Sequence, residues 1–86
     1  MSFIIEYDKQ PQEFLKKAEK QIAKRILDKI DEQLIKNPVP QNVKTMVGEH
    51  GVFRIRIGDF RALYRINYSE QKITIFKIDK RSKVYD

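Results

Sequence analysis

Hydrophobic and polar positions repeat with two different periods along the chain, and the change of period separates a helical half from a stranded half. Residues 12–36 carry apolar side chains at spacings of three and four positions, which predicts helix. From residue 52 onward the alternation is every second position, which predicts half-buried strands. Residues 2–7 are rich in β-branched and aromatic side chains and predict one further strand.

The helical half contains two apolar stripes separated by the polar residues 19–21. The stripes are Phe14, Leu15 and Ala18, and then Ile22, Ala23, Ile26, Leu27, Ile30, Leu34 and Ile35. The polar break is compatible with a turn between two helices and with the surface of one continuous helix. We expect a helical hairpin, because one straight helix of this length would project beyond so small a core. Asp8 and Pro11 give the helix-start signal, and the prolines within residues 37–40 mark its end.

The stranded half predicts a three-stranded antiparallel meander with tight turns between its strands. The expected strands are residues 52–57, 60–68 and 72–78, preceded by a weaker strand or extended segment at 43–47. Such a sheet has one apolar face that must be covered, and the amphipathic helical half is the available cover. The predicted fold is therefore α+β: an N-terminal strand, a helical hairpin and a C-terminal antiparallel β-meander, with the helices packed on one face of the sheet.

Composition limits the classes of protein that this chain can represent. With 86 residues, a single domain over residues 1–86 is expected. The absence of cysteine excludes a disulfide scaffold and a Cys-rich zinc module. His50, expected in a surface turn, is the only histidine, which excludes a His-rich metal site. No apolar run approaches the ~20 residues that cross a bilayer, and no secretion signal is recognisable, so we expect a soluble cytoplasmic protein.

The net charge of +6 is concentrated in the second half of the chain. Residues 1–50 hold nine Lys/Arg against eight Asp/Glu, whereas residues 51–86 hold nine against four. Arg25 is the single arginine of the first half. Those of the second half are Arg54, Arg56, Arg61, Arg65 and Arg81. A guanidinium presents a planar fork of donors that matches phosphate oxygens two at a time, so this distribution favours phosphate recognition.

Strand alternation suggests that several of these arginines share one surface. Arg54 and Arg56 are two positions apart and point to the same side of a strand, and Arg61 begins the next strand at an exposed position facing the same space. The tail can bring Arg81 and Tyr85 beside them. Fixed guanidinium groups would stabilise the extra charge of a pentavalent phosphorane. The alternative is an ordinary solvated sheet face, on which alternating arginines have no chemical role.

Residues 51–66, Gly-Val-Phe-Arg-Ile-Arg-Ile-Gly-Asp-Phe-Arg-Ala-Leu-Tyr-Arg-Ile, resemble the "G-x-y-R-x-R-x-G-x-y-R-v-l-Y" stretch of the RelE/ParE toxin superfamily. The ending at residues 80–85 resembles the basic tail of that family, which closes on Val-Tyr. The order of the expected elements also agrees. The resemblance therefore implies a RelE-like toxin domain belonging to a type II toxin–antitoxin system.

RelE-type members of this superfamily are ribosome-dependent endoribonucleases that cleave mRNA in the 30S A site and so inhibit translation. The resemblance implies transfer of the phosphoryl group to the neighbouring 2′-hydroxyl, without a metal or another cofactor, leaving a 2′,3′-cyclic phosphate or 3′-phosphate and a free 5′-hydroxyl. It also implies a RelB-like antitoxin, acidic and amphipathic, as partner, together with the ribosome and mRNA. Operator DNA would be bound only through the antitoxin, and no membrane is involved.

Matched position by position, the resemblance also assigns roles to residues. The catalytic set comprises Arg61, which would grip the scissile phosphate, with Arg81 and Tyr85 of the tail, the tyrosine helping to orient or activate the 2′-hydroxyl. The RNA- and phosphate-binding set comprises Arg54, Arg56, Arg65 and Lys80. Either Lys80 or Arg81 can fill the basic role of the tail. Some relatives carry lysine at the strand pair, but arginine is a poor proton donor, which favours an electrostatic role for Arg54 and Arg56.

Two further functions stay open at the level of sequence. ParE-type members of the superfamily inhibit DNA gyrase without cleaving nucleic acid. A basic RNA-binding module without catalytic activity would also account for the charge distribution. The chain has no evident general base, and a ribosome that holds and bends the message would supply much of the rate by positioning.

Overall fold

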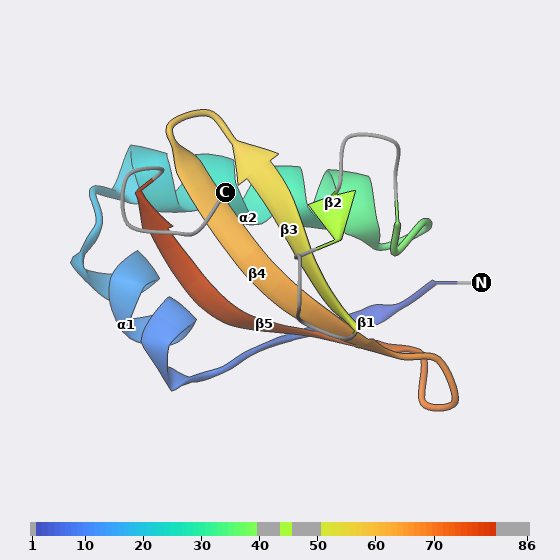
Figure 1. The fold of residues 1–86 in the computed structure, drawn as a ribbon. Coiled ribbons are helices and arrows are strands. Elements are labelled where there is room, and N and C mark those ends of the chain that lie inside the picture. The colour runs from blue at the N-terminus through green and yellow to red at the C-terminus, as the bar shows by residue number, and fades with distance from the viewer. Residues whose placement is uncertain (1, 40–43, 46–50, 81–86) are drawn as a thin grey trace.

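The computed structural model describes residues 2–39, 44–45 and 51–80, and their elements follow the predicted order (Figure 1). The elements are β1 (Ile4–Tyr7), α1 (Lys9–Lys17), α2 (Lys20–Leu34), β2 (Lys44–Thr45), β3 (Val52–Ile57), β4 (Phe60–Asn67) and β5 (Lys72–Lys80). The hairpin of helices is confirmed, because the backbone of Ala18 and Glu19 is extended and interrupts the helical half. Asp8 occupies the N-cap position, where its carbonyl accepts the Gln12 amide at 3.1 Å while its carboxylate makes no capping bond.

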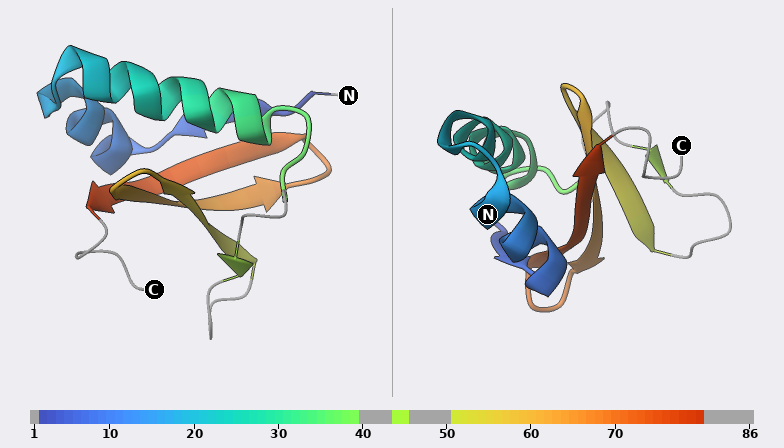
Figure 2. Two further views of the ribbon diagram at one scale, coloured as in Figure 1. Left: turned by 90° about the horizontal axis from the view of Figure 1, so that it is seen from above. Right: turned by 90° about the vertical axis from the view of Figure 1, so that its left-hand side faces the viewer.

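The described strands form one mixed sheet in the order β1-β5-β4-β3-β2. Strands β3, β4 and β5 make the expected antiparallel meander. The N-terminal strand β1 joins it in parallel, beside β5, so the two ends of the described chain are paired. Both helices lie on the same face of the sheet (Figure 2). The predicted α+β architecture is thus confirmed.

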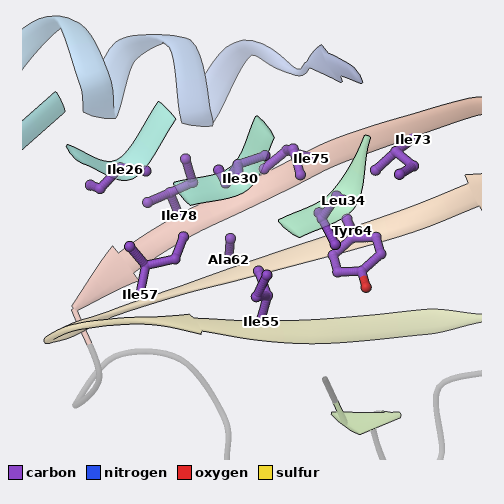
Figure 3. Close-up of a cluster of buried hydrophobic side chains, with 10 residues drawn as sticks. All are labelled: Ile26, Ile30, Leu34, Ile55, Ile57, Ala62, Tyr64, Ile73, Ile75 and Ile78. Carbon is purple, nitrogen blue, oxygen red and sulfur yellow. The ribbon is translucent and has the colours of Figure 1, made fainter. Parts of the chain in front are cut away.

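The core lies between α2 and the sheet (Figure 3). Its buried side chains are Ile26, Ile30 and Leu34 from α2 and Ile55, Ile57, Ala62, Tyr64, Ile73, Ile75 and Ile78 from the strands. The hydroxyl of Tyr64 donates to the carbonyl of Pro38 at 2.6 Å, and burial raises the pKa of this phenol. That bond fixes the chain beyond α2 against the centre of the sheet.

Several boundaries differ from those expected: β1 begins at Ile4 rather than residue 2, and α2 ends at Leu34 rather than residue 36. Helix α1 begins at Lys9, three residues earlier than residue 12, and β5 runs on to Lys80. Strand β4 ends at Asn67, so Tyr68 is 63% exposed and contacts only the rim, edge-on to Phe3. Of the expected strand at 43–47, the described part is β2, antiparallel to β3. The remainder of that strand, and the turn that contains His50, lie outside the described residues.

The pairing of β4 with β5 contains a β-bulge that alters which side chains reach each face. Leu63 pairs with Lys77 and Tyr64 pairs with Ile75, so Phe76 has no register partner. Such an extra residue shifts the alternation of one strand relative to its neighbour. As a result, Ile75 and Ile78 both reach the core although they are three positions apart. Phe76 and Lys77 then both lie on the face away from the helices.

Gln10 of α1 completes the edge of β5 where β1 has ended. The last main-chain contact of the β1 segment is the Asp8 amide, which donates to the carbonyl of Ile75 at 2.9 Å. Beyond it, the side-chain amide of Gln10 donates to the Ile78 carbonyl at 2.8 Å and accepts from the Ile78 amide at 2.9 Å. One side chain therefore replaces a missing strand residue and protects an exposed sheet edge.

We expect Gln10→Ala to lower the free energy of unfolding by about 1–3 kcal/mol, because it removes two hydrogen bonds from a partly buried backbone pair. Urea denaturation measures the change. Gln21→Ala, at an exposed position of α2, is the matched control and should stay within about 0.5 kcal/mol of the wild type. Equal values for the two variants would show that Gln10 does not secure the sheet edge.

Candidate functional site

The face of the sheet without helices carries the arginines of β3 and β4. Arg54 and Arg56 alternate along β3 with Ile55 and Ile57, which point into the core, so both arginines lie on the other face. Arg61 is the register partner of Arg56 across the β3–β4 hairpin. The structure therefore brings Arg54, Arg56 and Arg61 together at one end of the sheet. We call this surface the arginine face, comprising Arg54, Arg56, Arg61, Leu63, Arg65, Phe76 and Lys77.

Arg61 is buried, with 4% of its surface exposed, which corrects the expectation of an exposed strand position. It lies in β4, a central strand, between its register partners Arg56 on β3 and Asp79 on β5. Its Nη1 donates to the carbonyl of Phe60 at 3.2 Å. A guanidinium held in this way is fixed before any ligand arrives, which is the condition for electrostatic stabilisation of a developing charge.

Arg56 and Arg61 are like charges placed directly opposite each other on neighbouring strands. Like charges directly opposite each other destabilise a sheet unless a counter-charge or a bound anion lies nearby. On β5, Asp79 is the register partner of Arg61, so Arg56, Arg61 and Asp79 form one row across the three strands. Arg56 is exposed, so an anion from solution can approach it directly. The row can therefore hold an anion such as a phosphate between its two cations.

A second group of side chains lies further along the same face. The guanidinium carbon of Arg65 is 4.1 Å from the centroid of the Phe76 ring, a cation–π arrangement. Lys77, opposite Leu63, adds another cation between this pair and the Arg56–Arg61 row. Arg65 lies four residues from Arg61 on β4, roughly 13 Å at the usual rise of a strand.

The remaining residues of the predicted site do not join this group. Lys80 is the register partner of Phe60, whose ring packs edge-on against Phe14 of α1 at 5.7 Å, so its position belongs to the helix side of the sheet. Arg81 and Tyr85 lie outside the described residues. At the far edge of the sheet, Lys72 pairs with Glu6 at 3.1 Å, and this hydrogen bond raises the pKa of the lysine.

Sequence reasoning missed Lys77 and Phe76. Simple alternation from Ile73 and Ile75 puts residue 77 in the core, whereas the bulge turns Lys77 outward and leaves Ile78 inside. The signal in the sequence is the spacing of the isoleucines, two positions and then three. An interval of three in an alternating strand indicates a bulge.

Over the described ranges, His, Asp and Glu side chains form no group of three that could hold a metal ion. None of the described helices is long and apolar enough to cross a membrane. The arginine face offers positive charge beside an aromatic ring.

Comparisons with known proteins agree on one family. The family model described as the ParE toxin of the type II toxin–antitoxin system parDE matches residues 5–85. A curated protein of Methanocaldococcus jannaschii, described as a toxin, RelE1, is 33% identical over 88 residues, covering 99% of this chain and 97% of its own.

Solved structures give the same result for the fold. A chain in the crystal structure of the archaeal RelE–RelB complex from Pyrococcus horikoshii OT3 superposes with a TM-score of 0.80 at 28% identity, covering 98% of this chain and all of that one. The isolated RelE toxin of E. coli superposes with a TM-score of 0.78 at 18% identity, covering 98% of this chain and 92% of its own.

Proposed function

Since this chain belongs to the ParE toxin family, within the RelE/ParE superfamily of type II toxins, we propose that it is a ribosome-dependent endoribonuclease that cleaves mRNA in the A site. The observation that carries this proposal is the meeting of Arg54, Arg56 and Arg61 on the helix-free face of the sheet. A protein that only bound another protein would have no need for a buried guanidinium beside a second one. A phosphate-binding catalyst requires such an arrangement.

The reaction proposed is attack of a 2′-oxygen on the adjacent phosphorus. A bond forms between the 2′-oxygen and phosphorus as the bond from phosphorus to the 5′-oxygen breaks. The 2′-hydroxyl gives up its proton, and the leaving 5′-oxygen takes one up, so the products are a 2′,3′-cyclic phosphate and a 5′-hydroxyl. Arginines stay protonated at any physiological pH. Arg56 and Arg61 would therefore stabilise the negative charge of the phosphorane rather than exchange these protons.

The tail residues complete the proposal. Tyr85 would orient or activate the 2′-hydroxyl, and Arg81 would add positive charge near the leaving group, because Lys80 belongs to the helix side of the sheet. Neither a metal nor another cofactor takes part in this scheme. The ribosome would hold the message in the bent geometry that in-line attack requires, and such positioning can contribute several powers of ten to the rate.

The partner proposed for control of the toxin is a RelB-like antitoxin, in keeping with the complexes in which similar chains occur. An acidic, amphipathic segment would neutralise the arginine face and fold as it binds. Bound there, it would exclude RNA from Arg54, Arg56 and Arg61. We place this interaction in the cytoplasm, with operator DNA contacted through the antitoxin alone.

Arg56→Gln is expected to reduce the salt dependence of binding to a single-stranded oligoribonucleotide. Because one phosphate contact is lost, the slope of log K against log salt should fall by about 0.7. Fluorescence anisotropy over a range of salt concentrations measures the slope. Arg25→Gln, at an exposed position of α2 on the other face of the molecule, should leave it unchanged. An unaltered slope for Arg56→Gln would remove this residue from the RNA interface.

A ParE-type gyrase inhibitor is the second candidate, because the matching family model carries the ParE description. Two parallel assays separate the endoribonuclease from the gyrase inhibitor. Purified protein is added to ribosomes programmed with a defined message, and to DNA gyrase in a supercoiling assay. The proposal predicts cut messages and undisturbed supercoiling. Intact messages with inhibited gyrase would replace it by the ParE function, and RNA binding without any cut would leave a non-catalytic RNA-binding module.

A further inference from the structure

Phe76 of β5 places an aromatic ring among the cations of the arginine face. Phe76 has no register partner and lies on the arginine face, where it is half-buried. The exposed guanidinium of Arg65 covers its ring at 4.1 Å. With regular pairing, position 76 would oppose a residue of β4 and Lys77 would point into the core. The bulge therefore leaves Phe76 with no residue opposite it on β4 and puts Lys77 on the same face.

Stacking on a ring changes what a guanidinium offers to a ligand. Packing against the Phe76 ring restricts the conformations of the Arg65 side chain. Because Arg65 is exposed, the side of the guanidinium away from the ring is open to solvent. Unpaired nucleotide bases stack on aromatic side chains and on Arg guanidinium planes. A side chain that is already restricted loses less conformational entropy when a base stacks on it than a mobile arginine would. Arg56, by contrast, lies opposite another arginine and is suited to a phosphate.

We propose that Arg65, held over Phe76, is a stacking platform for one unpaired base of the bound RNA, an inference that rests on the proposed function. It assigns Arg65 to a base rather than to a phosphate. The platform stands roughly 13 Å along β4 from Arg61, so the base it receives belongs to a different nucleotide from the one whose phosphate contacts Arg61. Phe76 acts as the positioning residue, because it orients Arg65.

The probe for this proposal is a pair of single-stranded oligoribonucleotides of equal length, one an oligoadenylate and one lacking all bases. Both carry the same phosphates, so at fixed salt their difference in affinity for the full chain reports contacts to bases. The key variant is Arg65→Lys, which keeps the charge and loses the plane. Phe76→Leu keeps the apolar bulk and loses the ring. Arg25→Lys on α2 is the matched control, and thermal denaturation checks that each variant is folded.

We expect Arg65→Lys to weaken oligoadenylate binding by about tenfold while leaving the baseless strand within about twofold. Phe76→Leu should also weaken oligoadenylate binding more than binding of the baseless strand. Arg25→Lys should change the affinity for neither RNA. An equal loss on both RNAs would make Arg65 a phosphate contact and overturn the proposal, as would no loss on either.

A wild-type protein that bound neither RNA would remove the RNA-binding function and this platform together. If the wild-type protein cleaved messages on ribosomes but the variants lost no affinity for oligoadenylate relative to the baseless strand, only the stacking platform would be overturned. The two failures are therefore distinguishable.

Discussion

Replacing Arg61 by alanine is expected to lower the rate of message cleavage on the ribosome by about 100- to 1,000-fold. Its guanidinium is the most buried of the arginine face and already fixed by its contact with the Phe60 carbonyl. A preoriented charge that meets the phosphorane without reorganisation accounts for a loss of this size. Single-turnover cleavage of a defined message on programmed ribosomes gives the rate.

Because Arg61 is buried, the same substitution also disturbs packing, and a second variant separates the two effects. Arg61→Lys keeps the positive charge and loses the donor fork. We expect it to retain more stability than Arg61→Ala in urea denaturation while remaining at least tenfold slower in cleavage. Arg25→Ala on α2 should leave both quantities unchanged. Full activity of Arg61→Ala would show that this residue does not act on the phosphate.

Truncating the centre of α2 should have the largest effect on stability. Ile30 is fully buried between the helix and the sheet. Ile30→Ala leaves a cavity there, and we expect the free energy of unfolding to fall by about 2–5 kcal/mol. Small domains have only about 5–15 kcal/mol in total, so this variant should be partly unfolded at moderate temperature. Circular dichroism during urea denaturation measures the change.

Ile4→Ala is the matched control, because the same atoms are removed from a side chain that is 61% exposed on β1. It should cost less than about 1 kcal/mol. Comparable losses for the two variants would contradict the placement of the core between α2 and the sheet.

Local pattern was sufficient to predict the helices and the meander. Strand β3 agrees with its prediction at both ends, because Gly51 and Gly58 flank it and each adopts a positive φ, of 73° and 58°, that glycine reaches without strain. The polar break at residues 19–21 left one continuous helix possible, and the small size of the core favoured the hairpin that the structure has. These features depend on neighbouring residues, which periodicity and turn chemistry describe.

Long-range pairing could not be predicted from the same pattern. Nothing in residues 4–7 indicates that β1 joins β5 in parallel, since the two segments are separated by most of the chain. Alternation places Arg61 on the helix-free face but does not predict that it is buried there, between strands that come from different parts of the chain. The bulge at Phe76 is visible only as an irregular spacing of isoleucines.

The candidate site was predicted to a similar extent. Alternation placed Arg54, Arg56 and Arg61 on one face, where the structure has them. It did not find Lys77, because the bulge turns that side chain outward. Phe76 lies on the face that alternation gives it, but the sequence pattern alone did not single it out. Lys80 is the register partner of Phe60, and both positions lie on the helix side of the sheet. The roles of Arg81 and Tyr85 stay predictions.

The central claim is that guanidinium groups from β3 and β4 act on the same phosphate, and a double-mutant cycle between Arg56 and Arg61 tests it most directly. Cleavage rates on programmed ribosomes are measured for Arg56→Ala, Arg61→Ala and the double variant, with Arg25→Ala and Arg61→Ala as the uncoupled control pair. We predict that the double variant loses less than the product of the two single losses, with a coupling of about 0.5–3 kcal/mol. Losses that simply multiply, as in the control pair, would contradict the claim, and so would a wild-type protein that leaves the message intact.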